Sequence, residues 1–236
     1  MTRFAAAALA LMIFFASSAL AQNSTQTSAP LPQNSRIQVF GGYSLVHADT
    51  GGLTSSALNS ALDQPSNIFS VAHNFSGWNS EVQYNWKPRL GFVADFAGHY
   101  GNPFSSSNQA LVQLPDANEY SLMGGAVYTF KAKSKFTPFA HALVGGERYH
   151  LDAGSIPGLF GSSQWVTDWA LAAAVGGGVD YKVYPRFSVR LAQFDYYYTG
   201  HDLNAIYDHA FGPNVLPSLS SHENNLRFSA GIVVKF

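Results

Sequence analysis

The chain has 236 residues, and its 13 Lys and Arg against 14 Asp and Glu give a formal net charge of -1. This balance leaves no basic excess for a nucleic-acid surface, so nucleic acid is not an expected partner. Because there is no cysteine, the chain is neither a disulfide scaffold nor a lipoprotein acylated on an N-terminal cysteine. Charged residues make up only 11% of the chain, which is low for a soluble surface.

Residues 1–21 have the pattern of a cleaved secretory signal peptide. Arg3 supplies a short positive region, an apolar run extends from Phe4 to Phe15, and Ala19 and Ala21 form an A-x-A cleavage site. The apolar run is shorter than the roughly 20 residues of a spanning helix, so an uncleaved anchor is the weaker alternative. We therefore expect export. Removing Arg3 leaves 12 of the 13 basic residues against 14 acids in the mature chain.

The polar tract 22–35 contains Pro30 and Pro32 and predicts a flexible periplasmic lead. Beyond it, apolar and polar residues alternate with period two, which predicts β-strands. Eight such segments follow one another, at 36–45, 76–86, 89–100, 118–130, 136–150, 166–182, 186–199 and 224–236. In the seventh, Gln193 and Asp195 fall on the apolar row, and a bulge near Ala192–Phe194 would return Asp195 to the polar row.

The connections between these segments alternate between long and short. The long ones occupy 47–75, 101–117, 151–164 and 200–223, and the short ones 87–88, 131–135 and 183–185. Within the first, Ser55–Leu62 could form a short helix. About ten tilted residues cross a bilayer as a strand, and an open sheet edge is not viable in hydrocarbon. The pattern therefore predicts an up-and-down barrel in which the last strand pairs with the first.

The alternation, the asymmetry of the connections, the Arg190-Leu191 segment and the terminal Phe236 resemble the OmpA-like family of small outer-membrane barrels. The resemblance covers Arg36–Phe236. It implies an all-β fold, an eight-stranded antiparallel up-and-down transmembrane β-barrel in the bacterial outer membrane, surrounded by membrane lipid and lipopolysaccharide. It also implies that the barrel-assembly machinery reads Ile232, Val234 and Phe236. No peptidoglycan-binding domain follows the last strand, so tethering to the cell wall is not expected.

Four charged residues on the polar rows predict a network across the lumen. An Arg facing lipid near the midplane costs roughly 2 to 4 kcal/mol, so Arg190 and Arg227 should face inward. Glu81 and Asp95 lie at a similar height on other strands and would pair with them. Since the interior of eight strands is wide enough only for side chains, we expect a structural plug. A narrow gated channel is the alternative.

The sequence disfavours two kinds of chemical site, a hydrolase site and a metal site. A lipid A-modifying enzyme would need Ser220 or Ser221 together with His222 and Glu223, but adjacent residues point apart, so no catalytic residue and no enzyme activity are predicted. For a metal site, the candidates are four residues of the last connection: His201, Asp202, Asp208 and His209. Their spacing fits no regular ligand pattern, so we expect solvated loop residues, with no metal and no cofactor.

The remaining expectations concern surface and fold. Most of the exposed surface should come from residues 47–75 and 200–223, which favours surface interaction with an external ligand that the sequence does not identify. Gly176-Gly177-Gly178 is interpreted as packing and lumen glycine, because no helix or Lys-Ser/Thr pair follows it. A soluble lipocalin-like barrel is the alternative fold. It would bury the apolar rows, whereas here the opposite rows carry the charges.

Overall fold

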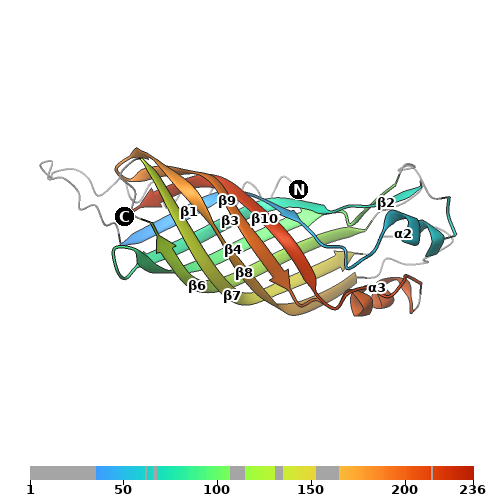
Figure 1. Ribbon diagram of the computed structural model, residues 1–236. Coiled ribbons are helices and arrows are strands. Elements are labelled where there is room, and N and C mark those ends of the chain that lie inside the picture. Colours follow the sequence, from blue (N-terminus) through green and yellow to red (C-terminus); the bar gives the residue numbers. More distant parts are fainter. Residues whose placement is uncertain are drawn as a thin grey trace, which may run out of the picture. The chain divides into compact units, whose positions relative to one another are not determined.

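The computed structural model describes residues 36–61, 63–65, 68–106, 115–130, 135–152, 165–213 and 215–236, without the side chains of Ala210 and Phe211. The expected signal peptide and lead, residues 1–35, lie outside these residues. Eight antiparallel strands close into a barrel in the order β1-β10-β9-β8-β7-β6-β4-β3 (Figure 1). Consecutive barrel strands are neighbours, and the last pairs with the first between Gln38 and His47 of β1. The predicted meander is therefore confirmed.

The barrel strands agree with the predicted segments to within a few residues. They are β1 (Ile37–His47), β3 (Asn74–Asn85), β4 (Leu90–Gly101), β6 (Asp116–Thr129), β7 (Phe136–Asp152), β8 (Trp165–Tyr184), β9 (Phe187–Thr199) and β10 (Glu223–Lys235). The longest are β7 with 17 residues and β8 with 20. Since about ten tilted residues cross the hydrocarbon layer, both strands extend beyond it.

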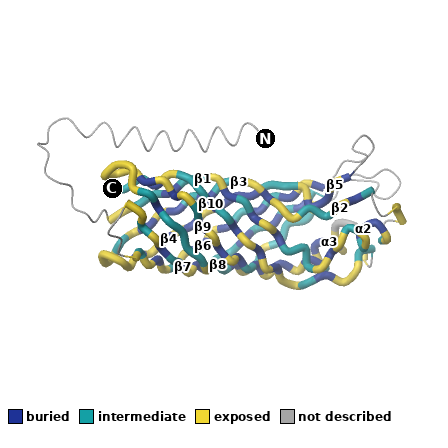
Figure 2. The backbone as a smooth tube through the Cα atoms, turned by 45° about the horizontal axis from the view of Figure 1, so that its top comes forward, coloured by how far each residue is buried: buried dark blue, intermediate teal, exposed yellow. Residues whose placement is uncertain are grey.

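Burial alternates along the strands, as the stripes of Figure 2 show. On β4, Phe92 and Phe96 are 59% and 45% exposed, whereas Asp95 between them is fully buried. Apolar side chains therefore cover the outer wall, and polar side chains fill the interior. This is the arrangement of a transmembrane barrel and the reverse of a lipocalin-like one. No helix among the described residues is long and apolar enough to cross a membrane.

The bulge predicted in the seventh strand is present, one to two residues earlier than expected. Arg190 of β9 pairs with Gly231 of β10, but Gln193 pairs with Ser229, so Leu191 and Ala192 face a single residue. A bulge inverts the alternation beyond it. Both Gln193 and Asp195 are consequently buried inside the barrel, and the placement of Gln193 on the apolar row is corrected.

The long connections contain regular structure that the sequence only partly predicted. The short helix is confirmed as α2 (Ser55–Ala61), while the pairing of β2 (Phe69–Val71) with β5 (Phe104–Ser106) and the helix α3 (Leu203–Phe211) were not predicted. Helices α2 and α3 lie at the end of the barrel opposite the C-terminus (Figure 1). We assign this end to the cell exterior, because transmembrane barrels have short periplasmic turns and long external loops.

Helix α3 forms for local reasons. Asp202 caps its N-terminus by accepting a 3.2 Å hydrogen bond from the Ala205 amide, and Gly212 follows its end with a φ of 100° that favours glycine. Leu203, Ile206 and Tyr207 are buried, and their i, i+3, i+4 spacing places them on one face. The last long connection therefore contains a short amphipathic helical pattern.

That face belongs to an apolar cluster, here called the outer cap, which closes the external end of the barrel. The cap joins lumen-facing residues of the strand ends to residues of three long connections. Its buried members are Val46, Ala48, Leu53, Leu58, Phe69, Phe75, Phe104, Ala117, Tyr149, Leu151, Leu203, Ile206, Tyr207 and Leu219. Burying this many apolar side chains orders connections that would otherwise be solvated.

Candidate functional site

The lumen contains two arginines, and the first, Arg190 of β9, binds two carboxylates on two other strands. Its Nη1 donates to Glu81 Oε2 at 2.6 Å and its Nε to Asp180 Oδ1 at 2.9 Å. The guanidinium carbon also lies 4.2 Å from the ring centroids of both Phe40 and Phe139. A buried guanidinium is stable only when its charge is compensated, and the two carboxylates supply that compensation here.

Arg227 of β10 makes the second set of ion pairs. It donates from Nη1 and Nη2 to the two oxygens of Asp95 at 3.0 and 3.1 Å, and from Nε to Asp195 Oδ2 at 3.0 Å. Asn79 donates to Asp95 as well, at 2.7 Å. Arg227 is only 1% exposed. Two carboxylates around one buried guanidinium hold its plane in a fixed position.

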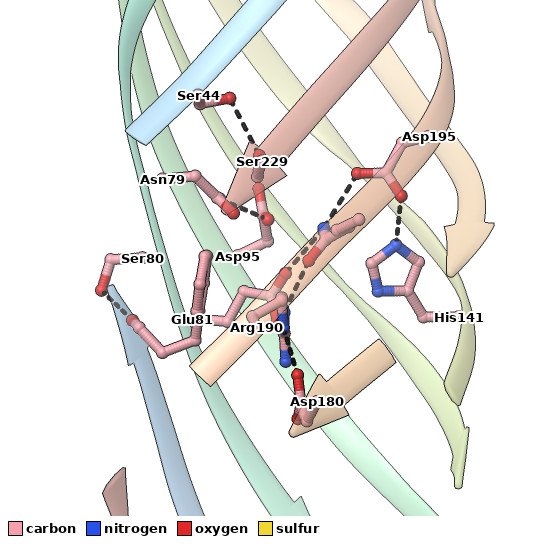
Figure 3. Close-up of polar contacts among 12 residues, drawn as sticks. Ser44, Asn79, Ser80, Glu81, Asp95, His141, Asp180, Arg190, Asp195 and Ser229 are labelled. Carbon is pink, nitrogen blue, oxygen red and sulfur yellow. Dashed lines mark hydrogen bonds and ion pairs between the residues drawn. The ribbon is translucent and has the colours of Figure 1, made fainter. Parts of the chain in front are cut away.

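Gln193 connects the two sets, and Figure 3 shows Glu81 and Arg190 of the first set and Asp195 of the second. Its side-chain amide donates to Glu81 Oε1 and to Asp195 Oδ2, both at 2.9 Å. Asp195 also bonds His141 Nε2 at 2.7 Å. The result is one network joining β3, β4, β7, β8, β9 and β10, here called the lumen ladder. Its members are Asn79, Glu81, Asp95, His141, Asp180, Arg190, Gln193, Asp195 and Arg227.

Polar contacts continue from the ladder to the external end. The Arg227 guanidinium lies 5.5 Å from the ring centroid of Tyr197, whose hydroxyl donates to Glu147. Glu147 in turn lies 3.4 Å from His201 Nε2, and His201 Nδ1 lies 2.8 Å from Asp168. Side chains thus bridge the interior from the periplasmic half of the barrel to the outer cap.

Acids outnumber bases in the interior. The buried acids are Glu81, Asp95, Glu119, Glu147, Asp180, Asp195 and Glu223, against Arg190 and Arg227 as the buried Lys or Arg of the described residues. The excess lies at the external end, where Glu223 accepts a 3.0 Å hydrogen bond from Thr199. No group of three or more His, Asp or Glu in the described part of the chain has the arrangement of a metal site.

The structure places the four lumen residues singled out from the sequence inside the barrel, paired as Arg190–Glu81 and Arg227–Asp95, and Gln193 joins the two pairs into one network. Sequence reasoning missed the joining role of Gln193, because the bulge that turns it inward has no unambiguous signal. The predicted bulge placed Asp195 inward, and only its partners across the lumen were unpredictable.

The expectation that His201 is a solvated loop residue is wrong. His201 is fully buried, whereas Asp202, Asp208 and His209 are exposed as expected. Burial opposes charging of the imidazole, but the neighbouring carboxylates of Glu147 and Asp168 outweigh it and raise the pKa of His201 above its ordinary value. His201 therefore attaches the start of the α3 segment to β7 and β8.

The residues considered for hydrolysis do not form a catalytic arrangement. His222 Nδ1 lies 3.4 Å from Ser220 Oγ, but Glu223 is turned inward and bonds Thr199 instead of orienting the imidazole. A nucleophile and base without an orienting acid lack the third group of a triad.

On the terminal strand, Ile232 and Phe236 face outward, being 57% and 52% exposed.

Comparison with known proteins shows a likeness of fold. No protein-family model and no curated protein matches the sequence. Among solved structures, the chain is similar to Ail, the attachment invasion locus protein of Yersinia pestis, in complex with the heparin analogue sucrose octasulfate, with a TM-score of 0.52, 16% identity, and coverage of 85% of this chain and 97% of that one.

Two further structures are similar. A second crystal structure of Ail has a TM-score of 0.50 and 15% identity, covering 85% of this chain and 97% of that chain. Neisserial surface protein A has a TM-score of 0.49 and 18% identity, covering 86% and 98%. The closed barrel, its apolar outer wall and the likeness to Ail give the chain the fold of the OmpA-like family, the small eight-stranded β-barrels of the bacterial outer membrane.

Proposed function

We propose that the chain is an outer-membrane barrel with a closed lumen that acts at the cell surface through its external connections, and that it is not an enzyme. The observation that supports this most directly is the filled interior. The lumen ladder bridges six strands, and the outer cap covers the external end. Eight strands enclose little more than the volume of their own side chains, so an interior filled by these groups supports a closed lumen.

A gated channel is the second candidate, and the pairing of Arg190 favours it. Because Arg190 already bonds two carboxylates on different strands, exchange between partners could open the lumen briefly without breaking the barrel. Both candidates place the same residues in the lumen. They differ in whether the wild-type ladder rearranges at the membrane potentials used in conductance recordings.

Recordings in planar bilayers separate the two. The plug predicts no steady current steps from the wild-type chain. In an Arg190→Ala/Arg227→Ala variant the unpaired carboxylates should hydrate and admit cations. Frequent wild-type steps whose duration changes in this variant would favour the gate, and identical conductance in both proteins would contradict gating. Folding of each protein is checked by its heat-modifiable migration on unboiled gels.

The charge of the external connections limits the external ligand. Residues 48–73, 102–115, 153–164 and 200–222 contain no Lys or Arg, and they carry Asp49, Asp63, Asp202 and Asp208. Such a surface repels polyanions. The sulfated ligand in the Ail structure is therefore not transferred to this chain, and a neutral or cationic surface ligand is proposed instead.

Cells that display the chain test this surface assignment. They should adhere to immobilised heparin no better than cells without it. A His209→Arg/His222→Arg variant, which adds two bases at exposed positions, should adhere better. Adhesion of wild-type cells well above the control would contradict the proposal.

Export and assembly complete the proposed function. We propose cleavage after Ala21, surroundings of lipopolysaccharide and membrane lipid, and recognition of Ile232, Val234 and Phe236 by the barrel-assembly machinery. The outward position of Ile232 and Phe236 supports the last point, because it leaves these side chains accessible before lipid covers them. N-terminal sequencing of the outer-membrane fraction tests the first, and the folded yield of a chain lacking Phe236 tests the last.

A further inference from the structure

The periplasmic end of the barrel carries a concentration of basic residues, here called the basic rim. They lie at the strand ends and turns opposite α2 and α3. The described members are Arg36, Lys87, Arg89, Lys135, Lys182, Arg186 and Lys235. Among the described residues of the external end, by contrast, Arg148 of β7 is the single Lys or Arg, so basic charge is strongly polarised along the barrel axis.

The described part of the chain offers the rim little acidic compensation. Six of its described members are exposed, Lys235 being half-buried, and none of the seven forms an ion pair with a described residue. The acid on this part of the lumen, Asp180, is buried and bound to Arg190. Like charges gathered on one rim repel one another, so the arrangement favours binding of external anions.

The members of the rim are distributed around the whole barrel. They occupy the β3–β4, β6–β7 and β8–β9 turns and the adjoining ends of β1 and β10, which together span the closed strand order. A single docked protein would cover one side of such a ring. A ring of charge instead matches a ligand that surrounds the barrel.

The rim also lies at the level of the interfacial aromatic residues. Lys87 Nζ is 4.7 Å from the ring centroid of Trp86, and Lys135 Nζ is 5.9 Å from that of Tyr181. Trp86 and Tyr184 are 60% and 66% exposed at the same end. Aromatic girdles sit at the headgroup level of a bilayer, so the bases beside them are at the height of lipid phosphates.

We propose that the basic rim binds anionic phospholipid headgroups of the periplasm-facing leaflet, forming a selective lipid annulus around the barrel. The inference rests on the transmembrane orientation of the proposed function and is independent of whether the lumen is closed. Bases near an anionic membrane surface interact with it by about 1 kcal/mol each, which corresponds to about fivefold in a binding constant. Binding should also stabilise the orientation in which this end of the barrel faces the periplasm.

Lipid retention by the folded full chain tests the proposal. The protein, in detergent, is mixed with equal amounts of phosphatidylglycerol and phosphatidylcholine of the same acyl chains, and retained lipids are counted by native mass spectrometry. The wild type should retain phosphatidylglycerol about fivefold over phosphatidylcholine. A Lys87→Gln/Arg89→Gln/Lys135→Gln/Arg186→Gln variant should lose this preference. The matched control, Lys87→Arg/Arg89→Lys/Lys135→Arg/Arg186→Lys, keeps the charge and should keep the preference.

Two outcomes would overturn the proposal: no preference in the wild type, or a preference unchanged in the glutamine variant. If that variant does not fold, the wild type alone decides, because its preference must fall when salt is raised from 50 to 500 mM if charge carries it. Binding of the wild type to isolated peptidoglycan, lost in the glutamine variant and without any lipid preference, would assign the rim to the cell wall instead. None of these outcomes depends on conductance.

Discussion

At the scale of single residues, the interior of this barrel is governed by compensation of buried charge. Arg190 and Arg227 each bind two carboxylates, and Gln193 joins the two sets. Alternation along the strands, together with the high cost of an Arg that faces lipid, predicted that the charges lie inside. The partner of each charged side chain could not be predicted. It depends on the stagger between strands and on the bulge in β9, and these determine the side chains that meet across the lumen.

Removing Arg227 should be strongly destabilising. An Arg227→Ala variant leaves Asp95 and Asp195 buried without their guanidinium, and breaking a buried pair in this way costs roughly 3 to 5 kcal/mol. Urea unfolding of the chain in liposomes measures the loss. The matched control Arg186→Ala removes an exposed rim guanidinium and should change stability by less than about 0.5 kcal/mol. Similar losses in the two variants would show that Arg227 is not compensating buried charge.

At the scale of elements, the barrel strands were predictable, whereas the structure of the external connections was predictable only in part. Period-two alternation identified all eight barrel strands, and the glycine run of β8 was correctly separated from a phosphate loop. The pairing of β2 with β5 and the packing of α3 against the other connections depend on apolar contacts between segments far apart in sequence, such as the ring contact of Phe104 with Tyr207 at 5.8 Å. No local pattern carries that information.

Gly176 of β8 should be intolerant of a side chain. A Cβ there would lie 2.2 Å from Asp195 Oδ1 and from the Phe194 carbonyl oxygen, so Gly176→Ala must displace the carboxylate that binds Arg227. We expect a loss of roughly 1 to 3 kcal/mol in urea unfolding. Gly124→Ala is the control, because its nearest neighbour is the Val93 carbonyl oxygen at 3.8 Å. Equal tolerance at both sites would argue against close packing of Asp195 on β8.

The attachment of α3 should weaken as pH rises. Because the folded pKa of His201 is raised above its unfolded value, its stabilisation is fully present below about pH 6.5 and is lost as pH rises through the folded pKa. The facing groups are Glu147 and Asp168, with Glu223 contributing charge from β10. Hydrogen exchange of residues 201–211, corrected for intrinsic rates, should increase between pH 6 and pH 9.

A His201→Gln variant provides the control for this pH dependence. Glutamine keeps hydrogen-bonding capacity but does not titrate, so exchange in the α3 segment should be faster than in the wild type at pH 6 and should rise less than in the wild type between pH 6 and pH 9. The same pH dependence in both proteins would assign the effect to another group.

At the scale of the whole molecule, polarity follows two directions. Across the wall, apolar side chains face outward and charged ones inward; along the axis, bases gather at the periplasmic end and the external connections carry acids without Lys or Arg. The polarity across the wall could be predicted from the alternation along each strand, and the prediction of the fold depended on it. The second direction became visible only when the topology assigned each turn to one end of the barrel.

The closed lumen is tested most directly by thiol labelling, because the natural chain has no cysteine. Ser121 and Leu122 are neighbours on β6, Ser121 being 2% exposed inside and Leu122 64% exposed on the outer wall. In liposomes, a lipid-soluble maleimide should label Leu122→Cys, and a small water-soluble maleimide should label neither Leu122→Cys nor Ser121→Cys until the protein is unfolded. Rapid labelling of Ser121→Cys by the water-soluble reagent in the folded protein would show a water-filled lumen and contradict the account.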